Sequence, residues 1–111
     1  MEKRTVLIID DEADFGLLLK RFFRNLDYTV YITTTLAEGL AMLETMEPDF
    51  IFLDNNLPDG MGWKIKEKIL KMCPNTHLNL ISSDHYMGKT HPSMDILEKP
   101  ISVDDLNRLF G

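Results

Sequence analysis

The sequence predicts an α/β fold in which helices cover both faces of a parallel β-sheet. Two observations support this prediction. Short apolar runs alternate along the chain with longer segments in which apolar residues recur every three or four positions. The short runs are typical of buried parallel strands, and the longer segments are typical of amphipathic helices. Strands that alternate with helices require crossover connections, which favour a parallel sheet over an antiparallel one.

Five segments are expected to form strands. In chain order they span residues 6–9, 28–32, 50–53, 78–81 and 94–97. Four of them are short apolar runs, and the segment 28–32 is rich in the β-branched and aromatic residues that favour strands. Right-handed crossovers leave few arrangements for five such strands.

The first and second helices are indicated by periodicity and by an end signal. Apolar residues at i, i+3, i+4, i+7, i+8 and i+11 form one face of the first helix: Phe15, Leu18, Leu19, Phe22, Phe23 and Leu26. A capping box, Thr35-x-x-Glu38, starts the second helix, and Pro48 is expected to end it. The second helix is expected to bury Leu36, Leu40 and Leu43.

Two further helices complete the pattern. The third is expected from Trp63 to Met72, with lysines facing solvent and Pro74 closing it. A second capping box, Ser102-x-x-Asp105, starts the last helix. Three apolar residues of that helix are expected to share one face: Val103, Leu106 and Leu109.

Polar residues follow four of the predicted strands, at the point where each strand ends. They are the acidic pair Asp10 and Asp11, the acid Asp54, the hydroxyl Ser82 with Ser83 beside it, and the lysine Lys99. Sites in open parallel sheets form at the carboxyl ends of the strands, so these side chains should converge in one crevice. Converged carboxylates repel one another unless a proton or cation lies among them. Together with a hydroxyl and a lysine, they suit a magnesium ion and a phosphoryl group.

The order and spacing of these residues resemble the receiver domain of two-component response regulators. The matches are the acidic pair, the loop Asp54-x-x-x-Pro58-x-x-x-Gly62, the hydroxyl after the fourth strand and the dipeptide Lys99-Pro100. They fall in register and cover essentially the whole chain. The resemblance implies a flavodoxin-like fold with a five-stranded parallel sheet in the order 2-1-3-4-5.

The resemblance also implies a role for each site residue. Asp54 would accept a phosphoryl group from a phosphohistidine, and Lys99 and Ser82 would contact the phosphoryl oxygens. Mg²⁺ would be held by four residues: Asp10, Asp11, Asp54 and the backbone carbonyl of Asn56. The chain would promote its own phosphorylation and dephosphorylation without turning over a separate substrate, so whether it counts as an enzyme stays open. The implied partners are a histidine kinase or phosphotransfer protein, and a downstream target protein or effector domain.

Several alternatives stay open beside this interpretation. Asp10 and Asp11 could simply cap the first helix, and Asp54 a turn. Ser83 competes with Ser82 for the hydroxyl role, because strand alternation points only one of them at the site. A degenerate receiver would act only as a protein-interaction module. Two enzymes on related folds rank lower: a haloacid-dehalogenase-type phosphatase needs an acid where Asn56 stands, and a flavodoxin would not place acids in its phosphate loop.

One region departs from the family pattern. The chain between Ser82 and Lys99 is shorter than in typical receivers by about one helical turn, so the helix that receivers place there is expected to be shortened or absent. The family's aromatic switch residue, three before the lysine, is replaced by Ile96, a β-branched side chain with little reach. A mobile segment at 83–94 is therefore expected to carry the response to phosphorylation in its place.

Size and composition exclude several classes. A chain of 111 residues is expected to form one domain, spanning 1–111. Its formal net charge of −6 argues against direct binding to nucleic acid or to an acidic membrane surface. A lone cysteine, Cys73, cannot form an internal disulfide. The sequence has no signal peptide and no stretch long enough to span a bilayer, and a cytoplasmic location is expected.

Overall fold

A computed structural model of the chain describes residues 4–82 and 94–111, and its main feature is a five-stranded parallel sheet. The strands of this sheet are β1 (Thr5–Ile9), β2 (Thr29–Thr33), β3 (Phe50–Asp54), β6 (His77–Ser82) and β7 (Met94–Glu98). Their order is β2-β1-β3-β6-β7, with every neighbouring pair parallel. In sequence order of these five strands this is 2-1-3-4-5, so the predicted topology is confirmed.

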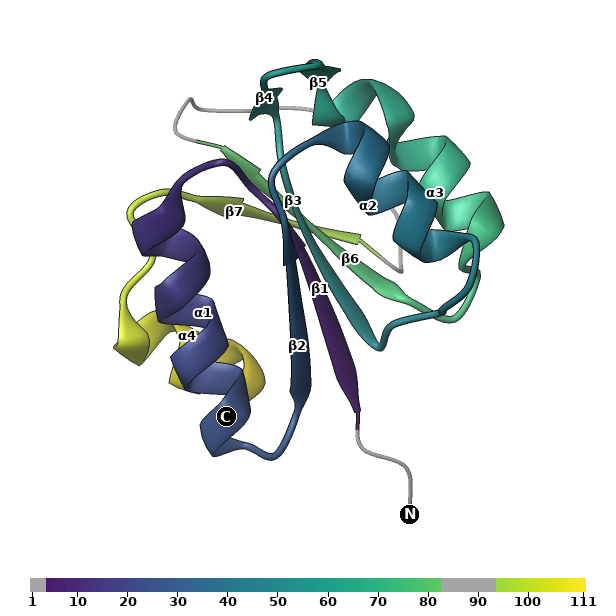
Figure 1. Cartoon of the computed structure of the whole chain (residues 1–111). Helices are drawn as coiled ribbons and strands as arrows, with labels where there is room; N and C mark the ends of the chain where they lie inside the picture. The colour runs from purple at the N-terminus through teal and green to yellow at the C-terminus, as the bar shows by residue number, and fades with distance from the viewer. Residues whose placement is uncertain (1–3, 83–93) are drawn as a thin grey trace.

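Helices cover both faces of the sheet (Figure 1). On one face lie α1 (Ala13–Asn25) and α4 (Val103–Phe110). On the other lie α2 (Leu36–Leu43), the 3₁₀ turn η1 (Gly62–Ile65) and α3 (Lys66–Met72). A short antiparallel hairpin of β4 (Asn56–Leu57) and β5 (Gly60–Met61) stands between β3 and η1. This hairpin was not anticipated from the sequence, because two-residue strands are too short to show a period.

The two faces of the sheet are packed with different side chains. On the α1/α4 face the ring of Phe23 lies 5.1–6.0 Å, centroid to centroid, from five other aromatic rings: Phe22, Tyr28, Phe50, Phe52 and Phe110. On the α2/α3 face the buried residues are mainly aliphatic, with Leu7, Ile51 and Leu78 fully buried. Because both faces are close-packed, the sheet is a stiff support for side chains at the ends of its strands.

The last helix is oriented differently from the prediction. Leu106 is fully buried and Phe110 packs into the aromatic cluster, whereas Val103 and Leu109 are about half exposed. Residues four apart lie on the same side of a helix, so the large ring of Phe110, together with Leu106, sets which side faces the sheet. The predicted grouping of Val103 and Leu109 with Leu106 on the buried face was wrong. The capping box of Ser102 and Asp105 is confirmed.

Two other helix predictions need correction. The second helix ends at Leu43, several residues before Pro48, and a last turn follows it in which the N–H groups of Thr45 and Met46 donate to the carbonyl of Met42. The expected third helix is divided: its first three residues, together with Gly62 before them, form the 3₁₀ turn η1, and only Lys66–Met72 is α-helical. Buried Trp63 lies in that first turn, where its bulk anchors the segment to the aliphatic core.

Some expectations concern residues outside the described part of the chain. The shortened or absent helix before Lys99, the mobile segment at 83–94 and Ser83 all fall wholly or mainly within 83–93. They therefore stay predictions. Within residues 4–82 and 94–111, no helix is both long enough and apolar enough to cross a membrane.

Candidate functional site

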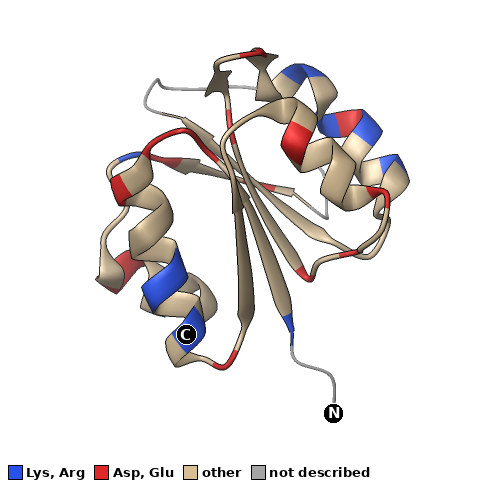
Figure 2. Ribbon diagram, in the orientation of Figure 1, with Lys and Arg blue, Asp and Glu red and all other residues tan. Residues whose placement is uncertain are grey.

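The predicted site residues lie at one edge of the sheet, where its parallel strands end. Asp10 directly follows β1, Asp54 is the last residue of β3, Ser82 is the last residue of β6 and Lys99 directly follows β7. These four strands are consecutive in the sheet. In the ribbon of Figure 2 the loop from β1 into α1 is red, the colour of Asp and Glu. The convergence expected from the sequence is therefore seen in the structure.

Three carboxylates form a compact cluster at this edge. Asp10, Asp11 and Asp54 each offer one carboxylate oxygen, and these oxygens all lie within 4.8 Å of one another. Asp10 and Asp54 are only 1% and 5% exposed, whereas Asp11 is exposed. The cluster is thus closed toward the core and open toward solvent on the side of Asp11, which would allow an ion to enter.

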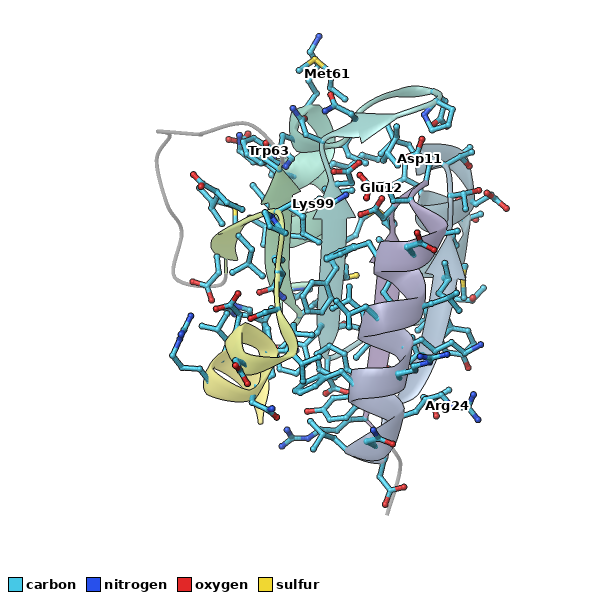
Figure 3. The ribbon with its side chains drawn as sticks, turned by 90° about the vertical axis from the view of Figure 1, so that its left-hand side faces the viewer. Asp11, Glu12, Arg24, Met61, Trp63 and Lys99 are labelled. Atoms are coloured by element: carbon cyan, nitrogen blue, oxygen red, sulfur yellow. The ribbon has the colours of Figure 1, made fainter. Side chains whose placement is uncertain are left out.

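Lys99 reaches into this cluster from the opposite side (Figure 3). Its Nζ lies 2.9 Å from Asp10 Oδ2, 3.1 Å from Glu12 Oε1 and 3.7 Å from Asp54 Oδ1. The lysine side chain is 9% exposed, so its charge is largely shielded from water. Within the described part of the chain, three carboxylates therefore contact this ammonium group, and that of Asp11 lies beside two of them.

Burial and mutual repulsion change the acid–base properties of these groups. Burial, then the charge of Asp10, raises the pKa of Asp54 to about 6, although Lys99 acts in the opposite direction. Burial alone would lower the pKa of Lys99, but the hydrogen bond and charge of Asp10 outweigh it, so this pKa is raised. Asp54 thus lies in an environment where a negative charge is costly and a nearby cation is favourable.

The alternative in which Asp10 and Asp11 cap the first helix does not fit the geometry. The N-cap of α1 is Glu12, and its side chain makes no capping hydrogen bond. Asp10 Oδ1 accepts a hydrogen bond from the backbone N–H of Glu12 at 2.9 Å, which orients the carboxylate while leaving Oδ2 directed at Lys99. Asp10 is therefore held in place by the turn before α1 but serves the cluster rather than the helix.

The loop after Asp54 folds back tightly over the end of β3. A Cβ atom on Gly62 would lie 2.1 Å from the carbonyl oxygen of Asp54, so only glycine permits this approach. The N–H of Gly62 donates to the carbonyl of Asn55 at 2.9 Å, and the N–H of Trp63 donates to Asn55 Oδ1 at 3.2 Å. Asn56, the expected carbonyl ligand, begins the β4–β5 hairpin in this loop.

Ser82 is buried at the end of β6, and its carbonyl accepts a hydrogen bond from the N–H of Lys99 at 2.8 Å. This bond joins the strand end that carries the hydroxyl to the residue that carries the ammonium. Because Ser83 lies outside the described residues, the choice between the two serines stays a prediction. The peptide bond between Lys99 and Pro100 is cis.

Two contacts of Lys99 were not anticipated from the sequence. Glu12 forms an ion pair with it, and the ring of Phe15 lies 4.8 Å from its Nζ. Phe15 was assigned to the core by its helical spacing, and it does pack there. A signal for Glu12 existed in its position directly after the acidic pair, but only the tertiary fold brings Lys99 to it.

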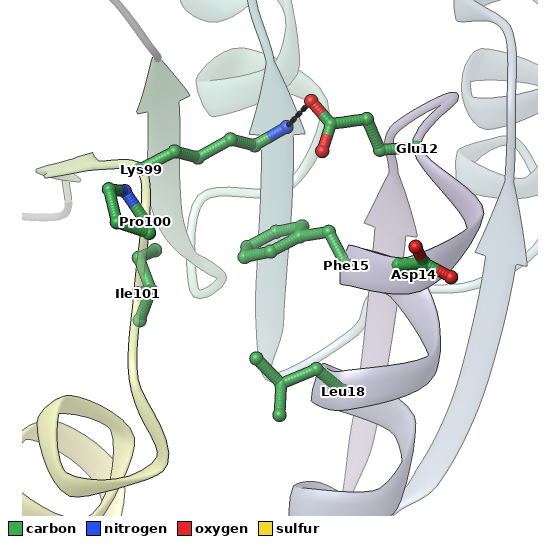
Figure 4. A pocket seen from close by; sticks show the side chains of 7 residues that line it. All are labelled: Glu12, Asp14, Phe15, Leu18, Lys99, Pro100 and Ile101. Atoms are coloured by element: carbon green, nitrogen blue, oxygen red, sulfur yellow. Dashed lines mark ion pairs between the residues drawn. The ribbon is translucent and has the colours of Figure 1, made fainter.

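A pocket of about 440 Å³ opens beside Lys99, between the start of α1 and the loop after β7 (Figure 4). Phe15, Leu18 and Ile101 provide apolar walls, while Glu12 and Lys99 stand at its polar end. The pocket places an apolar surface directly next to the charged cluster.

The donor set of the cluster fits a hard divalent cation. All side-chain donors are carboxylate oxygens, the ligands that Mg²⁺ and Ca²⁺ prefer, and they converge within 4.8 Å. Burial first, and then the negative charge of Asp10, raise the pKa of Asp54. A cation among these carboxylates would offset both effects by favouring the charged form of Asp54.

Comparisons with known proteins agree with this geometry. The family model of the response regulator receiver domain matches residues 6–110. The "Regulator of RpoS" of Escherichia coli K12 is 31% identical over 111 residues, covering 96% of this chain and 32% of that protein. This chain therefore spans about a third of the length of that relative.

Two solved structures share the fold. A CheY-like receiver domain from Methanospirillum hungatei has a TM-score of 0.82 at 24% identity, with 96% of this chain and 90% of that chain covered. A Burkholderia pseudomallei response regulator, solved with a phosphorylated aspartic acid, a calcium ion and citrate, has a TM-score of 0.80 at 18% identity. Its alignment covers 98% of this chain and 67% of the other.

Proposed function

This chain belongs to the response regulator receiver domain family of two-component signalling, and from that premise we propose that Asp54 accepts a phosphoryl group from a phosphohistidine on a partner protein. The observation that carries the proposal is the position of Asp54: a nearly buried carboxylate at the end of β3, between two further acids and a lysine. A carboxylate held in this way is a suitable nucleophile for in-line phosphoryl transfer.

The proposed step transfers one phosphoryl group without net oxidation or reduction. A carboxylate oxygen of Asp54 forms a bond to phosphorus, while the bond between phosphorus and the imidazole nitrogen of the donor breaks. The imidazole leaves with the electron pair of that bond and can take up a proton. The product is an acyl phosphate on Asp54, which water can later hydrolyse to restore the carboxylate.

Three carboxylates and one carbonyl would hold Mg²⁺ beside this nucleophile: those of Asp10, Asp11 and Asp54, and the backbone carbonyl of Asn56. When bound, the ion would neutralise the negative charge that develops on the phosphoryl oxygens. The all-oxygen donor set supports this assignment. The calcium ion and phosphorylated aspartic acid in the Burkholderia relative are consistent with it.

Lys99 would pair with a phosphoryl oxygen, and Ser82 would hydrogen-bond another. In the protein alone Lys99 lies closer to Asp10 and Glu12 than to Asp54. Its Nζ is nevertheless already within 4 Å of the proposed nucleophile, so only a small shift is needed for it to meet a phosphoryl group there.

Receivers of this family interact with histidine kinases or phosphotransfer proteins and with effectors, and we extend these partners to this chain. The apolar pocket is lined by Lys99, whose Nζ lies 3.7 Å from the proposed nucleophile, and it offers a surface on which a phosphodonor protein could bind. The net charge of −6 favours a protein partner over nucleic acid, and a cytoplasmic location suits such a partner. A degenerate receiver is less well supported, because the acids and the lysine are all present and in contact.

Incubation with Mg²⁺ and acetyl phosphate, followed by intact mass measurement, tests the proposal. One phosphoryl group should be added in the presence of Mg²⁺, and none when a chelator is present. Asp54→Ala should abolish the addition. Asp49→Ala changes an aspartate just before the other end of the same strand and should leave it intact. Equal labelling of the wild type and Asp54→Ala would refute the assignment.

A further inference from the structure

We propose that Asp59 is a positioning residue that fastens the loop carrying Asn56 to the N-terminus of α2, and thereby sets the cation affinity of the acidic cluster. Asp59 lies in the turn of the β4–β5 hairpin and is distant in sequence from α2. The inference rests on the proposed function, because it concerns the metal site that phosphoryl transfer would use.

The carboxylate of Asp59 binds the first two backbone amides of α2. Asp59 Oδ1 accepts a hydrogen bond from the N–H of Leu36 at 2.8 Å, and Oδ2 accepts one from the N–H of Ala37 at 2.9 Å. Both carboxylate oxygens are thus engaged by one helix end, where the helix dipole also favours negative charge. These hydrogen bonds, the one from Leu36 first, hold the pKa of Asp59 below its usual range.

Apolar contacts place the same turn against the same helix end. A Cβ atom on Gly60 would lie 3.2 Å from Leu36 Cδ1, so the backbone of the turn runs close to that leucine. Gly60 has a φ of +145°, a conformation that favours glycine. Leu57, at the other side of the turn, is buried in the same aliphatic core as Leu36. The charged and apolar contacts together seat the hairpin on α2.

The start of α2 is in turn tied to the acidic cluster through the end of β2. The N–H of Asp10 donates to the carbonyl of Thr33 at 3.1 Å, and Thr33 Oγ1 donates to the carbonyl of Ile8 at 3.2 Å. Three residues after Thr33, α2 begins with Leu36. A continuous series of contacts therefore connects Asp10 to the loop after Asp54. It runs from Asp10 to Thr33, along the chain into α2, and from α2 to Asp59.

These contacts should affect the proposed metal site through the position of the Asn56 carbonyl. The carboxylates of Asp10 and Asp54 are set by β1 and β3, but the carbonyl of Asn56 belongs to the loop. Its position relative to the carboxylates depends on how firmly the loop is held. Mg²⁺ requires nearly ideal octahedral geometry, so a loosened carbonyl ligand should weaken binding. Partners that orient metal ligands commonly contribute about 10- to 100-fold in affinity.

The role of Asp59 is expected to go beyond helix capping, because α2 also has a cap from a neighbouring residue. Thr35 Oγ1 accepts a hydrogen bond from the N–H of Glu38 at 3.1 Å, which is the third amide of the helix. The two caps bind different amides of one helix end, but of the two capping residues Asp59 belongs to the loop and Thr35 does not. Thr35 therefore provides a matched control for helix stability, and neighbouring Glu38 provides one for charge.

The test compares Mg²⁺ affinity, measured by titration calorimetry, in the wild type and three variants. Asp59→Ala should raise the dissociation constant about tenfold or more. Thr35→Ala removes the local cap, and Glu38→Gln removes one nearby negative charge; each should change the constant by less than about twofold. Equal weakening by Asp59→Ala and either control would refute the inference, because helix stability or charge would then explain the effect. No weakening in Asp59→Ala would also refute it.

Hydrogen exchange of the metal-free proteins provides a readout that does not depend on the ion. Asp59→Ala should speed amide exchange in residues 55–62, whereas Thr35→Ala should not, even though both lower the stability of α2. Unchanged amide exchange of residues 55–62 in Asp59→Ala would refute the inference that Asp59 holds this loop on α2. A wild type that binds no Mg²⁺ would instead refute the proposed function and the affinity effect, while the exchange result would still decide whether Asp59 holds the loop.

Discussion

Strand β3 has an aspartate at each end, and the two behave in opposite ways. Asp49, just before the strand, accepts a hydrogen bond from the N–H of Thr5 at 2.7 Å. Its own N–H donates to the carbonyl of Thr5, and its carbonyl accepts from the N–H of His77. Asp54, the last residue of the strand, lies instead among acids and one lysine.

The same contrast holds for the two edges of the whole sheet. At the amino edge, polar groups meet matching partners: Arg4 donates to the hydroxyl of Tyr28, and His77 pairs with Asp95. At the carboxyl edge, among residues 4–82 and 94–111, the carboxylates of Asp10, Glu12 and Asp54 all lie within 4 Å of the Lys99 ammonium, and Asp11 lies beside two of them. Polar groups at the first edge join neighbouring strands, whereas the surplus charge at the second opposes folding. A feature that destabilises the protein alone indicates a site kept for a ligand.

The largest effect on stability is expected when Lys99, a cation of the carboxyl edge, is replaced, and Arg4 at the amino edge provides the comparison. Lys99→Met should lower the free energy of unfolding of the metal-free protein by about 3 kcal/mol, because it removes the ammonium group that lies beside buried Asp10 and Asp54. Arg4→Met at the amino edge should change it by no more than about 0.5 kcal/mol, because Arg4 is exposed. Urea unfolding in the presence of a chelator measures both. Losses of similar size would contradict the contrast between the edges.

Replacement of Asp54, at the carboxyl end of β3, should stabilise the metal-free protein. The pKa of Asp54 is about 6 in the folded chain against an ordinary value of 3.8, so the folded state binds this proton more tightly. Stability from this group is therefore present at low pH and is lost as the pH rises from about 4 to about 6. At pH 7.5, Asp54→Asn should raise the free energy of unfolding by up to about 3 kcal/mol.

Unfolding at two pH values checks the origin of this gain. At pH 4.5 the gain of Asp54→Asn should be much smaller, because the wild-type acid is then largely protonated in the folded state. A gain that is the same at pH 4.5 and pH 7.5 would mean that repulsion of the charged acid is not its cause.

Magnesium should stabilise the wild type by a slightly smaller amount. An ion that binds only the folded state at a hundredfold excess over its dissociation constant adds about 2.7 kcal/mol. Asp11→Asn should weaken this gain, because it removes a carboxylate from the cluster. Asp49→Asn should retain it in full. Thermal unfolding with and without Mg²⁺ measures the effect, and a melting temperature that Mg²⁺ leaves unchanged in the wild type would argue against the metal site.

The smallest effect is expected at the amino end of β3. Asp49→Ala removes one charge-assisted hydrogen bond to the N–H of Thr5 and should cost about 1.5–2 kcal/mol of stability. Its sign is opposite to that of a change at Asp54. Urea unfolding of Asp49→Ala without metal should therefore show a loss, and a stabilised variant would break the comparison between the two aspartates.

The strands and helices could be predicted because their signals are local. Buried parallel strands require short apolar runs, and the capping box at Ser102 marks a helix start through hydrogen bonds within a single turn. The face of α4 was mispredicted for the opposite reason. Helical spacing allows Val103 and Leu109 to group with Leu106, but the packing of Phe110 against rings from α1 and β3 decides which side is buried.

The candidate site likewise has features that could be predicted from the sequence and features that depend on tertiary contacts. By itself the sequence determined which side chains stand at strand ends, and hence that Asp10, Asp11, Asp54, Ser82 and Lys99 share one edge of the sheet. Only the tertiary structure decided that Lys99 pairs with Glu12 and that Asp59 holds the start of α2. Each of these contacts joins segments that are far apart in the chain. A periodic pattern reports only a residue's own strand or helix, whereas such contacts depend on how the elements pack.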